Sequence, residues 1–278
     1  MKSIKSILLF LCASMTTTLA TEVNYTLVEG RGLAPLAPTI LPKYCRSPFA
    51  DFTFSPTGVP PPKNWAVALF DSFDSIDLSF SRQLNLALLA ETLDPVWVRP
   101  VHESFNTQNS SFWFSVNPTH TYDNPPQDVE VLLVPGGPGT RSGDVERAVE
   151  YVRDTYPGLK YLITTCTGAG IAARAGVLDG KRATTNKAAW GTVVRMRPNV
   201  NWVSPARWVV DGNIWTASGV TSGLDLMFAF VDQIYGEDLT RGIQGVVEYE
   251  RNKGACSDPF AEWHGVPPTG ECIETQEN

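Results

Sequence analysis

The stretch YLITTCTGAGIAARAGVL, residues 161–178, places a cysteine where a strand would pass directly into a helix. Cys166 follows a run of strand formers, and Gly168 and Gly170 leave room for a sharp turn. At such a helix N-terminus the unpaired backbone N–H groups and the helix dipole favour a thiolate. The pattern therefore favours a cysteine nucleophile, and a small buried hydrophobic side chain is the alternative.

A glycine-rich turn, VPGGPG at residues 134–139, ends another predicted strand. Its backbone N–H groups could point at negative charge that develops beside the thiolate, as in an oxyanion hole. An ordinary strand-to-helix turn is the alternative. Because open parallel sheets bind ligands outside the carboxyl ends of their strands, both turns are expected at the same end of one sheet.

Acidic side chains follow a third predicted strand, WAVALF at residues 65–70. Asp71 and Asp74 fit the role of helix N-caps with solvated side chains. Asp77 differs because apolar residues flank it. A carboxyl group desolvated there, next to a thiolate, would have a raised pKa and could shuttle a proton at neutral pH.

The elements that must hold these residues follow from apolar runs and their spacing. Strands are predicted at 65–70, 96–104, 112–116, 129–137 and 161–165, helices over about 76–91, 144–155, 167–178, 222–235 and 239–250, and a hairpin over 207–219. Strands that alternate with helices predict an α/β fold, a three-layer sandwich around a mainly parallel central sheet.

Composition divides the chain into four regions. Residues 1–20 resemble a signal peptide, 21–64 form a Pro-rich arm, 65–250 hold the predicted core domain, and 251–278 form a Cys-containing tail. In that tail, Phe260 and Trp263 are expected to cover part of the core.

The first twenty residues predict an exported protein, because two lysines precede a short apolar run and a small-residue end. Two sequons, at Asn24 and Asn109, fit a glycosylating secretory pathway. The later cysteines allow two disulfides, or one disulfide that leaves Cys166 as a thiol. In the second case the candidates are Cys45, Cys256 and Cys272, and Cys256 with Cys272 is the simplest pair.

The charge balance argues against two classes of partner. The net charge is −7, and removal of the first twenty residues, which hold only basic charges, would make it more negative. An acidic chain of this kind has no electrostatic footprint for nucleic acid or an anionic membrane. No metal site and no cofactor motif is recognised, so the expected partner is a small-molecule substrate.

Four motifs together resemble one family. They are FDSFDSIDL, PTHTYDNPPQDVEVLLVPGGPG, TTCTGAGIAARAGVLDGKRATTN and WTASGVTSGLDLMFAFVDQIYG. Their order and spacing resemble the ThiJ/PfpI superfamily, relatives of class I glutamine amidotransferases, over roughly residues 65–250. The resemblance implies a flavodoxin-like, class I glutamine amidotransferase-like fold. The cysteine-threonine pair and SGVTSGLDL look most like the isocyanide hydratase branch.

The resemblance assigns roles to five residues. Cys166 matches the family nucleophile, and Asp77 matches its acidic partner. Gly137 and Thr167 match the positions whose backbone N–H groups line the anion pocket. The Thr167 hydroxyl matches a group that touches the reacting centre in the hydratase branch, and Asp225 matches a carboxylate of the surrounding shell.

One position departs from the pattern. Many family members have histidine after ATT, where this chain has Asn186. Of the other histidines, His120 lies in a loop that the family places near the pocket, His102 is expected in strand packing and His264 in the tail. Without an adjacent imidazole, protease or amidase chemistry is not expected, and proton transfer would fall to Asp77.

These inferences predict a cofactor-independent lyase or hydratase in which the thiolate attacks an isocyanide and water releases an N-substituted formamide. A related hydratase or isomerase acting on a secondary metabolite and a glyoxalase-like activity on a 2-oxoaldehyde would use the same parts. A non-enzymatic, exported binding or redox-responsive protein is the alternative from another class. Homodimerisation is common in the resembling family, but the residues do not establish it here.

Overall fold

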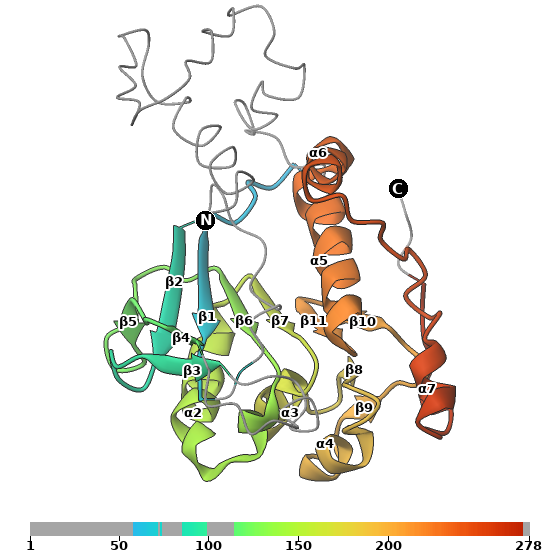
Figure 1. Ribbon diagram of the computed structural model, residues 1–278, viewed down its shortest axis with the longest axis horizontal. Helices are drawn as coiled ribbons and strands as arrows, with labels where there is room; N and C mark the ends of the chain where they lie inside the picture. Colours follow the sequence, from blue (N-terminus) through green and yellow to red (C-terminus); the bar gives the residue numbers. More distant parts are fainter. Residues whose placement is uncertain (1–57, 72, 74–84, 99–113, 275–278) are drawn as a thin grey trace, which may run out of the picture.

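The computed structural model describes residues 58–71, 73, 85–98 and 114–274 (Figure 1). Its centre is a seven-stranded sheet in which only the pairing of β10 with β11 is antiparallel. In spatial order the strands are β10 (Trp208–Asp211), β11 (Ile214–Ala217), β7 (Tyr161–Thr164), β6 (Val131–Val134), β1 (Asn64–Ala68), β2 (Asn85–Ala90) and β5 (His120–Thr121). The predicted flavodoxin-like α/β fold is confirmed.

Both faces of the sheet are covered. Successive residues of a strand point to opposite faces, and all residues of β6 and β11 are buried. On one face, Phe230 of α5 (Val220–Tyr235) meets Trp65, Tyr161 and Trp215 edge-on, with ring centroids 5.6, 5.0 and 5.1 Å apart. Elsewhere α2 (Glu146–Thr155) packs on α3 (Gly168–Arg174), which packs on β6 and β7.

The following elements complete the described chain. They are β3 (Val96–Val98), β4 (Phe114–Val116), β8 (Arg182–Ala183), β9 (Asn201–Trp202), the 3-10 turns η4 (Pro138–Arg141), η5 (Gly143–Val145) and η6 (Tyr156–Gly158), and the helices α4 (Trp190–Met196), α6 (Glu237–Val247) and α7 (Pro259–Trp263). None of the described helices is long and apolar enough to cross a membrane.

The helix predicted over about 76–91 is wrong for its second half. Residues 85–90, NLALLA, form β2, which pairs in parallel with β1 from Asn64↔Asn85 to Ala68↔Leu89. Leucine and alanine favour a helix locally. Pairing with a buried neighbouring strand outweighs that preference, because it satisfies the backbone of both strands.

The tail is fastened to the domain rather than lying loosely beside it. Ser204 of the domain pairs with Thr269 across an isolated bridge, the Arg207 N–H donates to the Ala255 carbonyl oxygen at 2.7 Å, and a disulfide within the tail joins Cys256 to Cys272. The expectation that the tail's aromatic residues cover the core is wrong, since Trp263 is 78% exposed and Phe260 is 42% exposed. Small residues take that place instead: Ala255 and Ala261 are buried.

Candidate active site

Cys166 lies on the turn between β7 and α3, where the sequence predicted it. Its φ angle is +52°, a left-handed backbone conformation that is uncommon for a residue with a side chain. Such strain costs roughly 1–3 kcal/mol and persists only where neighbouring groups enforce it. One such group is the hydroxyl of Thr185, which donates to the Cys166 carbonyl oxygen at 2.8 Å. The side chain of Cys166 is buried and is not in a disulfide.

Glycines allow the two turns at this sheet end to touch. A Cβ atom on Gly136 would lie 2.4 Å from the Cβ and 3.0 Å from the Sγ of Cys166. A Cβ atom on Gly168 would lie 2.3 Å from the Val134 carbonyl oxygen. Gly137 has a φ angle of +136°, which only glycine adopts readily. The glycine turn is therefore packed directly against the cysteine.

The Thr167 hydroxyl joins these turns by two hydrogen bonds. It accepts from the Gly137 N–H at 3.0 Å and donates to the Gly137 carbonyl oxygen at 3.1 Å. The two residues expected to form the anion pocket are thus brought together. The Gly137 N–H is occupied by the hydroxyl here, so an oxyanion could accept from this N–H only if Thr167 released it.

Asp225 is buried within a different network. Its Oδ2 atom accepts from the Nε of Arg207 at 2.9 Å, and the two side chains form an ion pair. Its Oδ1 atom accepts from the Tyr249 hydroxyl at 3.0 Å and from the Asn252 N–H at 2.8 Å. Burial, followed by the Asp225 charge, raises the pKa of Tyr249 to about 12. In these contacts Asp225 anchors the start of the tail.

A buried lysine that sequence reasoning missed lies beside the elbow. The Nζ of Lys187 is 2.9 Å from Oδ2 of Asp258, and both side chains are fully buried. Burial lowers the pKa of Lys187, and the Asp258 charge opposes that shift. Four further oxygens lie 2.9–3.2 Å from the ammonium and share its three N–H donors: Thr184 Oγ1, Thr185 O, Ala206 O and Ser218 Oγ.

Lys187 connects the tail to the nucleophile through one intermediate residue. Asp258, which caps α7 by accepting from the Phe260 N–H, pairs with Lys187. Lys187 donates to the Thr185 carbonyl, and the Thr185 hydroxyl donates to the Cys166 carbonyl. No local pattern in the sequence marks this pair, because the two residues lie far apart in the chain.

His120, which the family resemblance places near the pocket, lies away from the turn that carries Cys166. His120 lies on β5, at the far edge of the sheet, where its Nδ1 is 2.9 Å from the Thr119 hydroxyl. Four strand spacings, roughly 19 Å, separate β5 from β7. Asn186 directly follows Thr185, the residue whose hydroxyl donates to the Cys166 carbonyl. The Oδ1 atom of Asn186 accepts from the Ala189 N–H at 3.1 Å.

Several predicted residues lie outside the described part of the chain: Asp77, Asp74, His102, Cys45, Asn24 and Asn109. The proton-shuttle role of Asp77 therefore remains a prediction. Among the described residues, no group of three or more His, Cys, Asp or Glu could hold a metal ion.

The parallel sheet and the cysteine elbow define a class of protein. The family model for the DJ-1/PfpI family matches residues 65–233, and the chain belongs to that family. Over 160 residues it is 30% identical to isonitrile hydratase from Pseudomonas putida, covering 57% of this chain and 68% of that protein. It is also 27% identical over 207 residues to the HTH-type transcriptional regulator GbdR from Pseudomonas aeruginosa, covering 72% of this chain but only 55% of the regulator.

Solved structures agree on the fold. A ThiJ/PfpI family protein from Pseudomonas syringae superposes with a TM-score of 0.59 at 24% identity, covering 74% of this chain and 84% of that one. DJ-1beta from Drosophila melanogaster superposes with a TM-score of 0.54 at 15% identity, covering 68% and 99%. At these identities the likeness shows the architecture and leaves the reaction to be argued from the site.

Proposed function

We propose that this protein is a cofactor-independent hydratase in which Cys166 attacks a small electrophile, most simply an isocyanide. The observation that carries the proposal is the strained, buried turn at Cys166, with Gly136 packed against its sulfur and Thr185 holding its carbonyl. Strain of this kind concentrates at functional sites. The similarity to isonitrile hydratase supports the choice of substrate class.

The reaction balances with water as the only co-reactant. The Cys166 thiolate bonds to the terminal isocyanide carbon, which takes up a proton and becomes a thioimidate. Water then adds to that carbon, the carbon–sulfur bond breaks, and an N-substituted formamide leaves as the thiolate is restored. In this proposal Asp77 moves the protons. The N–H of Thr167 stabilises the negative charge that develops, and the N–H of Gly137 joins it when the Thr167 hydroxyl releases it.

Turnover of a panel of alkyl and aryl isocyanides tests this mechanism, with the formamide measured by mass spectrometry. Cys166→Ser should abolish formamide production, because a serine hydroxyl at the same position is a far weaker nucleophile at neutral pH. An unchanged urea midpoint would show that the fold is intact. Formamide production at the wild-type rate by a folded Cys166→Ser variant would refute the mechanism. A 2-oxoaldehyde panel, assayed in the same way for hydroxy-acid formation, tests the glyoxalase-like alternative.

A binding or redox-responsive role is the second candidate. Two observations favour it: the similarity to a transcriptional regulator, and the Gly137 N–H that Thr167 already occupies. A thiolate at this elbow could be oxidised to the sulfinic acid, which would end nucleophilic chemistry. Absence of turnover on both panels, together with a mass increase of two oxygens on Cys166 after peroxide treatment, would favour this role.

We also propose that the protein is exported and works in an oxidising compartment. The signal-like first twenty residues and the Cys256–Cys272 disulfide support this location. Mass spectrometry of the protein from its native source should find a chain that starts near residue 21. A chain that retains residues 1–20 would contradict export through cleavage of a signal peptide.

A further inference from the structure

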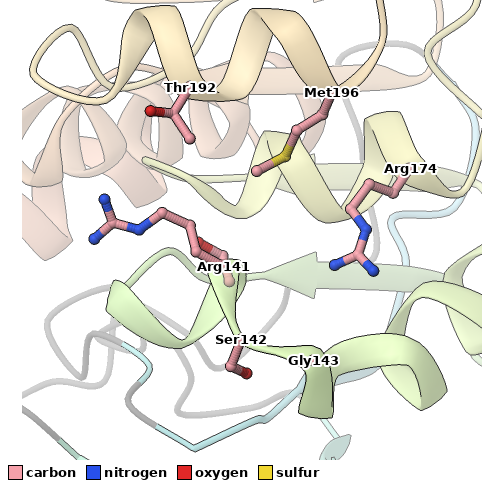
Figure 2. Close-up of a pocket in the computed structure, with 7 residues that line it drawn as sticks. Arg141, Ser142, Gly143, Arg174, Thr192 and Met196 are labelled. Carbon is pink, nitrogen blue, oxygen red and sulfur yellow. The ribbon is translucent and has the colours of Figure 1, made fainter.

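A cavity of about 490 Å³ lies between residues 140–143, which follow the glycine turn, and the helices α3 and α4 (Figure 2). Its walls come from η4 and the following loop on one side and from the two helices on the other. The lining residues are Thr140, Arg141, Ser142, Gly143, Arg174, Thr192 and Met196. Nothing in the proposed reaction uses this cavity.

Two guanidinium groups give the cavity its charge. Figure 2 shows them on opposite sides of the space, with the thioether of Met196 between them. Arg174 forms an ion pair with Glu146. Among the described residues, no carboxylate lies within ion-pair distance of Arg141. The described side chains around this cavity therefore leave one positive charge uncompensated.

The cavity adjoins the nucleophile without including it. The Thr140 hydroxyl donates to the Gly137 carbonyl oxygen at 2.8 Å, so one wall is hydrogen-bonded to the glycine turn. On the other side, a Cβ atom on Gly170 would lie 3.1 Å from the sulfur of Met196. Gly170 is four residues beyond Cys166 in the chain and lies in the first turn of α3. The cavity therefore shares its walls with the segment that follows the glycine turn and with the helix that follows Cys166.

We propose that this cavity is a subsite for an anionic group, a carboxylate or a phosphate, on the ligand whose reactive carbon meets Cys166. The guanidinium of arginine presents paired N–H donors that match both groups. The hydroxyls of Ser142 and Thr192 line the same space, and Met196 offers an apolar surface to the linking carbons. The inference rests on the proposed function and narrows its substrate class to isocyanides or related electrophiles that carry an anionic substituent.

Alkylation of Cys166 by two reagents that differ in charge tests the subsite. Iodoacetate is anionic and iodoacetamide is neutral. A change in the reactivity of the thiol alters both alkylation rates alike, so the ratio of the two rates reports only the electrostatic potential near Cys166. A unit charge on the order of 10 Å away, at an intermediate dielectric, corresponds to roughly a threefold effect. Arg141→Gln should lower the iodoacetate-to-iodoacetamide ratio about threefold, while Arg141→Lys retains most of it.

The matched control is Arg153→Gln. Arg153 lies exposed on α2 and forms no ion pair with a described carboxylate, so its replacement should leave the ratio unchanged. The effect of Arg141→Gln should also shrink at high salt, because ions screen it. Equal ratios in the wild type, Arg141→Gln and Arg153→Gln would overturn the subsite.

Calorimetric titration with inorganic phosphate and with acetate measures anion binding at the subsite independently of any reaction at Cys166. Saturable binding of either ion to the wild type, weakened at least fivefold by Arg141→Gln and unchanged by Arg153→Gln, is the expected result. The tighter of the two ions identifies the class of anionic group. Absence of saturable binding, or equal binding by Arg141→Gln, contradicts the subsite. Failure of iodoacetamide to label Cys166 contradicts the proposed function instead, so the two failures are distinguishable.

Discussion

Breaking the Lys187–Asp258 ion pair should destabilise the protein severely. Both side chains are fully buried, and their charged atoms are 2.9 Å apart. Asp258→Asn would leave a buried ammonium without its counter-charge, and Lys187→Met would leave a buried carboxylate in the same position. Removing one partner of such a pair costs about 3–5 kcal/mol. That is a large part of the roughly 5–15 kcal/mol by which a folded domain is stable.

Urea denaturation followed by tryptophan fluorescence measures this cost. Each single variant should lower the free energy of unfolding by about 3–5 kcal/mol, whereas Lys187→Met combined with Asp258→Leu should cost less than the sum of the two, because no charge is left buried. Lys160→Met is the matched control, since Lys160 pairs with Glu130 at the surface and should contribute about 1 kcal/mol or less. Single variants that cost no more than Lys160→Met would refute the reasoning.

The same variants test whether the tail supports the nucleophile. Lys187 donates to the Thr185 carbonyl, and the Thr185 hydroxyl donates to the Cys166 carbonyl. Loss of Lys187 should therefore change the rate at which iodoacetamide labels Cys166 in protein that is still folded, while Lys160→Met leaves that rate unchanged. An unchanged labelling rate in folded Lys187→Met would show that the connection is purely structural.

Three further outcomes follow from the structure. Replacing both cysteines of the Cys256–Cys272 disulfide with serine should cost about 3 kcal/mol in a urea titration, from the loss of a closed loop of this length, and an equal midpoint would contradict it. Gly136→Ala should slow iodoacetamide labelling and destabilise the fold, because its methyl group would meet the nucleophile's Cβ at 2.4 Å, whereas Gly158→Ala has open space and should do neither. Burial raises the pKa of Tyr122 far above its ordinary value, so the unfolded state loses its proton first and stability should fall above about pH 10, by up to about 1.4 kcal/mol per pH unit. Tyr122→Phe should reduce that slope, and an unchanged slope would count against the buried phenol.

The sequence predicts those strands and turns whose conformation is set by residues that are neighbours in the chain. WAVALF and YLITT are short apolar runs that fit buried strands, and both form central strands of the sheet. The cysteine elbow was equally readable, since a strand, a cysteine and spaced glycines leave few other conformations. The hairpin over 207–219 formed as predicted because Gly212, with a φ angle of +63°, permits its turn.

Features that depend on distant partners were not predictable in this way. NLALLA reads locally as a helix and becomes β2 only through pairing with β1. Phe260 and Trp263 are large and apolar, yet both rings are exposed. The tail instead buries Ala255 and Ala261, next to the disulfide. The partnership of Lys187 with Asp258 needs the tail folded back on the domain, which no spacing in the sequence encodes.

The central claim is that Cys166 is a reactive nucleophile, and brief iodoacetamide treatment at neutral pH tests it most directly. Peptide mapping should show a rapidly formed carbamidomethyl group on Cys166, with the Cys45 peptide scored separately, while Cys256 and Cys272 remain joined. Asp77→Ala should change the rate of that labelling, because the proposed proton shuttle acts on the same thiol. A native protein that takes up no label at Cys166, or in which Cys166 is found in a disulfide, would contradict the account.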